Sequence, residues 1–348
     1  MTIKQNLSEL IGNTDLLKLN TLSEMTGNDI YVKCEFQNPG GSIKDRAALQ
    51  MVEDAIEAGQ LKPGMTIVEG TAGNTGIGLA IVAKSLGFKL LTVMPKGQTP
   101  EKERMIKLHG SELLLVDPCP FANPNHFYHT ARRLGEENDD YWWANQFENL
   151  SNSKAHYRKT GPEIWQQTDG KIDILVSVCG TGGTIGGNSK FLSEQKPDCQ
   201  TWLIDPNGSG IKSYLETGEY KATGGSFTEG IGIMRSVANF REAHIDKAVT
   251  LSDQDAVTIS RAVRDQEGLV LGSSAALNVA GALLAAVKHQ GQEKTIVTFA
   301  CDLGERSFSK LYNEEFLADK EIDSKESIDA LLNRYNKFDD AEIIKVKK

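Results

Sequence analysis

Lys44 is the residue of this chain best suited to covalent chemistry. It follows Asn38-Pro39-Gly40-Gly41-Ser42, whose proline and glycines exclude regular structure, and it precedes an apolar-periodic stretch that predicts a helix starting just after Ser42. The positive end of a helix dipole disfavours a cation, so a lysine in the first turn is more readily a free amine. Such an amine forms a Schiff base with a carbonyl substrate or with pyridoxal phosphate, and the alternative is a solvated surface lysine.

A glycine-rich loop, Gly180-Thr181-Gly182-Gly183-Thr184-Ile185-Gly186-Gly187, connects a predicted strand to a predicted helix. Its backbone N–H groups and the helix dipole can hold a phosphate, and glycine lets the backbone approach the anion closely. A dinucleotide site is the alternative, because Asp205 ends the next predicted strand where a ribose-binding acid is expected. The third glycine of that fingerprint would fall on Ile185, so we favour another phosphate ligand over a nicotinamide cofactor.

A second loop, Glu69-Gly70-Thr71-Ala72-Gly73-Asn74-Thr75-Gly76, also joins a strand to a helix. Its hydroxyls, its amide and the helix N-terminus could bind a carboxylate. A simple helix cap would explain Thr71 or Asn74 alone, but not both together with three glycines. Two anion sites and a reactive lysine indicate an amino acid held beside a phosphorylated carbonyl cofactor.

These loops belong to an alternation of strands and helices. Strands are expected at residues 29–35, 66–69, 89–94, 112–116, 174–178, 201–205 and 295–299, and helices at residues 76–85, 101–109 and 126–137 and after residue 184. This order predicts an α/β fold with parallel sheets covered on both faces, in which ligands lie at the carboxyl ends of strands.

Composition narrows the class of protein. The 348 residues predict about two domains, and the net charge of -9 argues against a nucleic-acid partner. The five cysteines form no C-x-x-C pair and the six histidines have no metal spacing, which fits a reducing cytosol and no metal site. No leader or membrane-spanning run is evident, so we expect a cytoplasmic protein with no membrane partner.

Three motifs in order, Asn38 to Arg46, Thr71 to Gly76 and Gly180 to Thr184, resemble the lysine, asparagine and phosphate loops of fold type II pyridoxal-phosphate enzymes. Within that class the chain resembles the cysteine synthase and cystathionine β-synthase family, over about residues 7 to 315. The resemblance implies two three-layer α/β domains of the tryptophan synthase β-subunit type. It further implies a smaller, mobile substrate domain at 46–150, a larger cofactor domain at 1–45 and 151–318, and a charged tail at 319–348.

The resemblance also implies roles for individual residues. Lys44 would carry pyridoxal phosphate and move the substrate α-proton. Asn74 would bind the ring hydroxyl of the cofactor, and Ser274, in Gly272-Ser273-Ser274, would face the pyridine nitrogen, with simple helix capping as the alternative for the two serines. The expected phosphate ligands are Gly180, Thr181, Gly182, Gly183 and Thr184, and the expected substrate-carboxylate ligands are Thr71, Ala72, Gly73, Asn74, Thr75 and Gln146.

A serine at the pyridine nitrogen makes the cofactor a weaker electron sink than an aspartate would, which favours chemistry at the β-carbon. Together with this chemistry, the resemblance implies cysteine synthase activity, from an O-activated serine such as O-acetylserine and sulfide or a thiol. The resemblance alone also implies a homodimer. Ala72 stands where cysteine synthases usually carry serine, and Ala275-Ala276 replace a common glycine. Cysteine desulfhydrase is accordingly the close alternative, followed by cystathionine β-synthase and by a catalytically idle relative that binds partner proteins.

Overall fold

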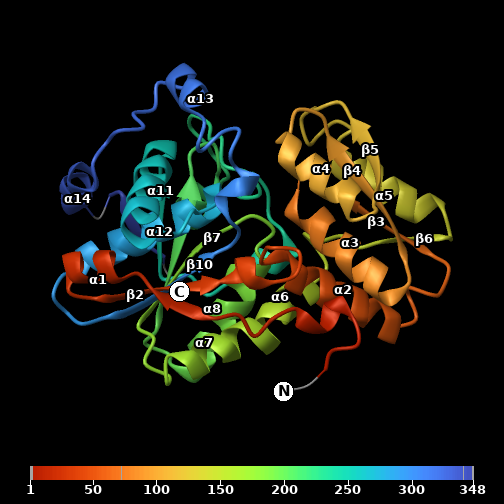
Figure 1. Ribbon diagram of the computed structural model, residues 1–348, viewed down its shortest axis with the longest axis horizontal. Coiled ribbons are helices and arrows are strands. Elements are labelled where there is room, and N and C mark those ends of the chain that lie inside the picture. Colours follow the sequence, from red (N-terminus) through yellow and green to blue (C-terminus); the bar gives the residue numbers. More distant parts are fainter. Residues whose placement is uncertain (1–2, 72, 340, 347–348) are drawn as a thin grey trace.

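The computed structural model describes residues 3–71, 73–339 and 341–346. The chain forms two lobes, each built on its own sheet, and the smaller lobe occupies the orange-to-yellow right-hand side of Figure 1. The α/β class and the alternation of strands and helices expected from the sequence are confirmed.

The larger sheet has, within the described residues, seven strands in the order β1-β2-β10-β7-β8-β9-β11. Its interior strands run parallel, whereas the edge strands β1 and β11 are antiparallel to their neighbours. The strands are β1 (Leu16–Lys18), β2 (Asp29–Cys34), β7 (Ile174–Val178), β8 (Gln200–Pro206), β9 (Lys247–Leu251), β10 (Thr295–Ala300) and β11 (Ile343–Lys345).

The smaller sheet is parallel throughout its described part, in the order β5-β4-β3-β6. Its strands are β3 (Thr66–Gly70), β4 (Lys89–Pro95), β5 (Glu112–Val116) and β6 (Tyr141–Trp143). Because both sheets are parallel at their centres, the carboxyl ends of their strands gather the loops that the sequence singled out.

Helices cover both sheets. In the first half of the chain they are α1 (Asn20–Thr26), α2 (Lys44–Glu57), α3 (Asn74–Leu86), α4 (Pro100–Leu108), α5 (Phe127–Glu137), α6 (Ser151–Ala155) and α7 (Gly161–Gln167). The others are α8 (Gly183–Gln195), α9 (Ile211–Thr217), α10 (Ala238–Arg241), α11 (Asp253–Glu267), α12 (Ser273–Lys288), α13 (Glu314–Asp319) and α14 (Ile328–Asn336). Short 3₁₀ turns are η1 (Leu7–Leu10), η2 (Glu35–Gln37) and η4 (Gly304–Arg306), and η3 (His156–Thr160) is a π-helical segment between α6 and α7.

The main core of the larger lobe is organised around α12, whose alanine-rich sequence lets neighbours approach closely. Every residue from Ser273 to Val287 is buried, between the sheet and α11. At Gly281 a Cβ would lie 2.3 Å from Ile204 Cγ1, so only glycine allows this helix–sheet distance. The start of α12, with its serines, is thereby fixed at the carboxyl edge of the sheet.

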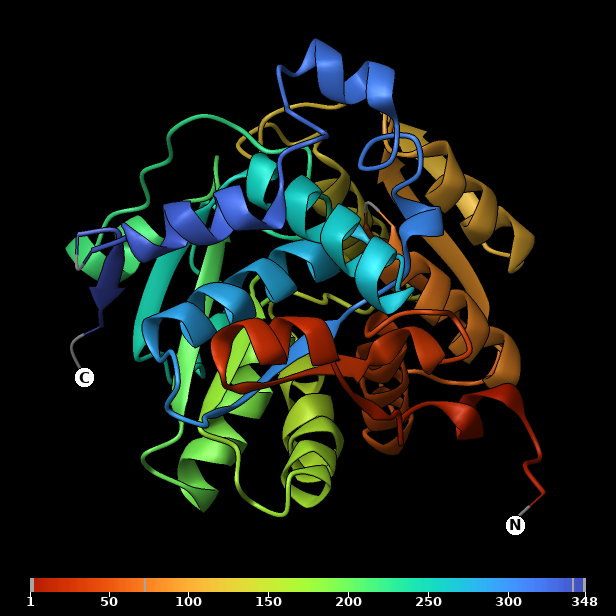
Figure 2. The same ribbon diagram turned by 60° about the vertical axis from the view of Figure 1, so that its left-hand side comes forward.

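The end of the chain packs onto the larger lobe. Helix α14, on the left side of Figure 2, packs beside α11 and α12. It buries Leu331 and Tyr335 there. Strand β11 then pairs with β9, Ile343 lying opposite Val249. The charged sequence of this region therefore surrounds a small apolar face that the larger lobe covers.

Candidate active site

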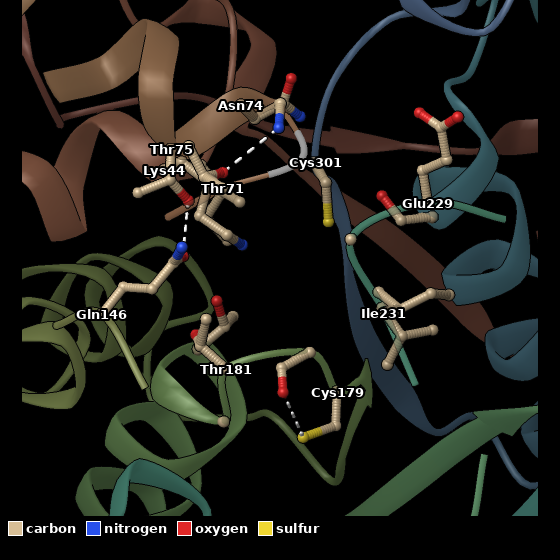
Figure 3. Close-up of a pocket in the computed structure, with 18 of the residues that line it drawn as sticks. Lys44, Thr71, Asn74, Thr75, Gln146, Cys179, Thr181, Glu229, Ile231 and Cys301 are labelled. Atoms are coloured by element: carbon tan, nitrogen blue, oxygen red, sulfur yellow. Dashed lines mark hydrogen bonds between the residues drawn. The ribbon is translucent and has the colours of Figure 1, made fainter. Parts of the chain in front are cut away.

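A cavity of about 220 Å³ lies between the lobes and is lined by loops from both sheets. Figure 3 shows Lys44, Thr71, Thr75 and Thr181 around this hollow, with Glu229 and Ile231 on its other side. The structure thus brings together the lysine, asparagine and phosphate loops, although long stretches of chain separate them. Ala72, an expected substrate ligand, lies outside the described residues.

Lys44 is half-buried and is the first residue of α2. Its backbone N–H donates to Ser42 Oγ at 3.3 Å, and the N–H of Ile43 donates to the carbonyl of Cys301 at 3.0 Å. Gly41 has φ +69°, a conformation that favours glycine. The turn before Lys44 is therefore anchored to the end of β10, and the lysine side chain faces the cavity.

The phosphate loop is held tightly by its neighbours. Thr181 Oγ1 accepts from Asn152 Nδ2 at 2.9 Å, and Gly182, with φ +85°, precedes the first turn of α8. A Cβ on Gly183 would lie 2.0 Å from Asn152 Oδ1, and one on Gly180 would lie 2.1 Å from the carbonyl oxygen of Gly230. Glycine is required at both positions, and the N-terminus of α8 opens on the cavity, where its backbone N–H groups can hold an anion.

Asn74 begins α3, and Gly73, not Asn74, is the N-cap of that helix. Its Nδ2 donates to Asp302 Oδ2 at 2.7 Å, while its Oδ1 accepts from Arg306 Nη1 at 3.0 Å. Asp302 and Arg306 are both buried and belong to the larger lobe. The asparagine of the smaller lobe is therefore clamped between a carboxylate and a guanidinium across the junction of the lobes.

Gln146 and Thr75 form a hydrogen-bonded pair beside the cavity. Thr75 Oγ1 donates to Gln146 Oε1 at 2.7 Å, and Gln146 Nε2 donates to Glu69 Oε1 at 3.1 Å and to the carbonyl of Gly70 at 3.2 Å. A carbonyl only accepts, so the amide group of Gln146 must face Gly70. Burial raises the pKa of the Glu69 carboxyl to about 8.

Ser274 lies in the first turn of α12, after the N-cap residue Gly272, and lines the cavity. The N-cap of this helix is Gly272, so Ser273 and Ser274 are its first two helical residues and not its cap. Cys301 lies beside Ser274 and accepts from Asn278 Nδ2 at 3.3 Å. Burial raises the pKa of the Cys301 thiol to about 12, so this cysteine is neutral at physiological pH.

Lys102 and Glu229 are cavity residues that the sequence did not indicate. Lys102 Nζ lies 2.5 Å from Glu229 Oε2, and Lys310 Nζ lies 2.6 Å from Glu229 Oε1. Burial alone would raise the pKa of Glu229, but the two ammonium groups outweigh it and lower that pKa. Lys102 is in the smaller lobe, so this ion pair joins the lobes across one side of the cavity.

Asp205, the candidate ribose ligand of the dinucleotide alternative, is buried. Its Oδ2 accepts from the backbone N–H of Lys212 at 2.9 Å at the start of α9, and burial raises its pKa to about 6. This carboxyl supports the fold beneath the neighbouring loop and does not line the cavity. Asp205 is therefore not placed to bind a ribose in the cavity, and the dinucleotide interpretation has no acidic residue to support it.

The residues present fit pyridoxal phosphate: a lysine faces the cavity, and the glycine-only α8 N-terminus can hold a phosphate in the same space. Residues 7–302 match the model of the pyridoxal-phosphate-dependent enzyme family. The chain belongs to this family of enzymes, and pyridoxal phosphate is its cofactor.

Known relatives define the branch of the family more closely. Cysteine synthase 1 of Neurospora crassa is 44% identical over 325 residues, which cover 92% of this chain and 86% of the relative. The crystal structure of O-acetyl serine sulfhydrylase isoform 3 from Entamoeba histolytica superposes with a TM-score of 0.83, at 30% identity and 97% coverage of both chains. The crystal structure of a hydrogen sulfide-producing enzyme from Fusobacterium nucleatum superposes with a TM-score of 0.78, at 32% identity. The match covers 88% of this chain and 99% of that enzyme's chain.

Proposed function

We propose that this enzyme is a cysteine synthase, which converts O-acetyl-L-serine and sulfide to L-cysteine and acetate. The observation that carries the proposal is the convergence of Lys44 with two anion-binding helix N-termini, those of α3 and α8, in one cavity. Its similarity to cysteine synthase 1 supports the same reaction. When bound, pyridoxal phosphate withdraws electrons from the α-carbon of an amino acid and so makes its α-proton acidic.

In this proposal Lys44 holds the cofactor, and its freed amine moves the substrate α-proton. The first turn of α8, with Gly180 to Thr184, holds the phosphate. Ser274 faces the ring nitrogen, and Asn74 can donate its second amide hydrogen to the ring hydroxyl while it keeps its hydrogen bond to Asp302.

The substrate carboxylate would occupy the N-terminus of α3, between Thr71 and Thr75. Since the amide hydrogens of Gln146 are directed to Glu69 and Gly70, the backbone N–H groups of this turn are the first donors to the carboxylate. Gln146 reaches the substrate through the hydroxyl of Thr75, whose hydrogen it accepts. Removing the Gln146 side chain should accordingly weaken substrate binding indirectly, because Thr75 loses the acceptor of its hydroxyl hydrogen.

The direct test is product formation by the purified protein with pyridoxal phosphate. Cysteine from O-acetylserine and sulfide, lost in Lys44→Ala, is the expected result. The second candidate is cysteine desulfhydrase, which converts L-cysteine and water to hydrogen sulfide, pyruvate and ammonia, and similarity to the hydrogen sulfide-producing enzyme of Fusobacterium nucleatum favours it. Rapid pyruvate formation from cysteine alone, without cysteine formation from O-acetylserine, would select this second reaction.

We further propose a cytoplasmic homodimer whose smaller lobe, at 46–150, moves against a larger cofactor lobe formed by 1–45 and 151–318. Support for the division comes from the separate sheets and from the cavity between them. In the described part of the chain, no helix combines the length and the apolar character needed to cross a membrane. Light scattering of the purified protein tests the dimer.

A further inference from the structure

Residues 218–237 form a long irregular connection between α9 and α10 and close one side of the cavity. Gly230 to Ile233 line the cavity directly. The backbone N–H of Gly232 donates to the carbonyl of Cys179 at 2.7 Å, so the connection runs against the start of the phosphate loop. Any outward movement of this segment would expose the cavity to solvent.

Arg235 fastens this segment to aromatic side chains. The central guanidinium carbon of Arg235 lies 4.7 Å from the ring centre of Phe121 and 4.9 Å from those of Tyr128 and Phe147. Its Nη1 also donates to Glu148 Oε1 at 2.8 Å. Three rings and a carboxylate thus surround one guanidinium, whose side chain is 25% exposed.

The rings come from the opposite side of the cavity. Phe121 precedes α5 and Tyr128 lies within it, in the smaller lobe, whereas Phe147 lines the cavity itself. Arg235 therefore joins the segment of the larger lobe to the smaller lobe. Cation–π attraction is strongest when the cation is largely removed from water, as this guanidinium is.

We propose that Arg235 is a positioning residue that holds residues 218–237 over the cavity and so determines how much substrate is lost to water. This inference rests on the proposed cysteine synthase function. It assigns to Arg235 a role in reaction specificity, namely the ratio of replacement to elimination.

The two reactions share the loss of the α-proton and of the β-acetate group. In replacement, the sulfur of hydrogen sulfide forms the new bond to the β-carbon, and the products are cysteine and acetic acid. In elimination, one water molecule hydrolyses the carbon–nitrogen bond instead, and the products are pyruvate, ammonia and acetic acid. Neither reaction needs an oxidant or a reductant. The two reactions differ in their second reactant, so the relative access of water and of sulfide to the cavity decides between them.

The test compares Arg235→Met with Arg264→Met in the protein loaded with pyridoxal phosphate. Arg264 lies on α11, its side chain is 41% exposed, and its Nε lies 2.6 Å from Oδ1 of the neighbouring Asp265. Among the described residues it makes no hydrogen bond or ring contact with residues 218–237. We expect Arg235→Met to raise the pyruvate-to-cysteine ratio by about tenfold, since losing a desolvated cation–π contact shifts a two-state equilibrium by roughly that factor. Arg264→Met should leave the ratio unchanged.

Hydrogen exchange gives a readout that does not depend on turnover. The amides of residues 218–237 should exchange faster in Arg235→Met than in the wild-type protein, and Arg235→Lys, which keeps the charge but not the planar group, should fall between them. Unchanged exchange would refute the holding role of Arg235, and faster exchange with an unchanged product ratio would refute its role in specificity. A wild-type protein that makes no cysteine would refute the proposed function, while the exchange data would still decide whether Arg235 holds the segment.

Discussion

Glu163→Gln is the substitution for which the structure predicts the clearest loss of stability. The Glu163 carboxylate accepts from both terminal nitrogens of Arg46 at 2.7 Å and lies 2.8 Å from Lys33 Nζ. The side chains of Arg46 and Lys33 are completely buried, and Arg46 also pairs with buried Glu35. This network joins α7 and β2 to α2, two residues from Lys44.

The electrostatics of Glu163 give the magnitude. Burial alone would raise its pKa, but hydrogen bonds and charge interactions with Arg46 and Lys33 lower that pKa from 4.5 to about 2. A carboxyl shifted in this way stabilises the folded protein at neutral pH by roughly 3 kcal/mol. Removing one partner of a buried ion pair costs about 3–5 kcal/mol, which agrees.

Urea denaturation of the protein saturated with pyridoxal phosphate measures this effect. Glu163→Gln should lower the unfolding free energy by about 3 kcal/mol at pH 7. Because the folded-state pKa is depressed, the stabilisation is present above pH 4.5 and is lost as the pH falls towards 2. The difference between wild type and variant should shrink over that interval.

Glu242→Gln is the matched control, since Glu242 pairs with Lys190 at 3.1 Å with both side chains about two-fifths exposed. An exposed pair of this kind contributes less than about 1 kcal/mol. Equal stabilities of Glu163→Gln and Glu242→Gln at pH 7 would contradict the reasoning. A difference between wild type and Glu163→Gln that stayed constant down to pH 3 would contradict the assignment of the pKa.

Three other substitutions have defined outcomes. Gly180→Ala should weaken pyridoxal phosphate binding by about tenfold or more in a fluorescence titration, because its Cβ would overlap a backbone carbonyl, whereas Gly225→Ala, in open space, should not. Asn74→Ala should lower the unfolding free energy in urea by about 2 kcal/mol, because the carboxylate and guanidinium that clamp it lose a buried partner. Lys102→Met should return the pKa of Glu229 towards its ordinary range, as a carboxyl NMR titration would show, and an unchanged pKa would mean that Lys310 alone lowers it.

The loops that converge on the cavity could be predicted because each is a short contiguous motif. Glycine and hydroxyl residues between a strand and a helix specify an anion site locally, and parallel strands bring such loops to one edge. The lysine turn, the asparagine loop and the phosphate loop all met these conditions. Strands β2, β3, β4, β5, β7, β8 and β10 were evident for the same local reason, whereas β1 and β9 were not predicted.

The bridges between the lobes could not be predicted, because each joins side chains far apart in the sequence. Lys102 and Glu229 are separated by 127 residues, and Asn74 and Asp302 by 228. Nothing in either local sequence distinguishes these charges from solvated ones. The edge strand β11 was missed because it has only three residues and lies in a charged segment. It forms by pairing with β9, which is distant in the sequence.

The central claim is that Lys44 carries pyridoxal phosphate, although Lys102 lines the same cavity. Borohydride reduction of the loaded protein, followed by peptide mass mapping, tests it most directly because the reduced cofactor remains on the lysine that held it. A pyridoxyl group on Lys44, and none on Lys102, is the predicted result. Labelling of Lys102 with Lys44 unmodified, or no stable labelling of either, would contradict the account.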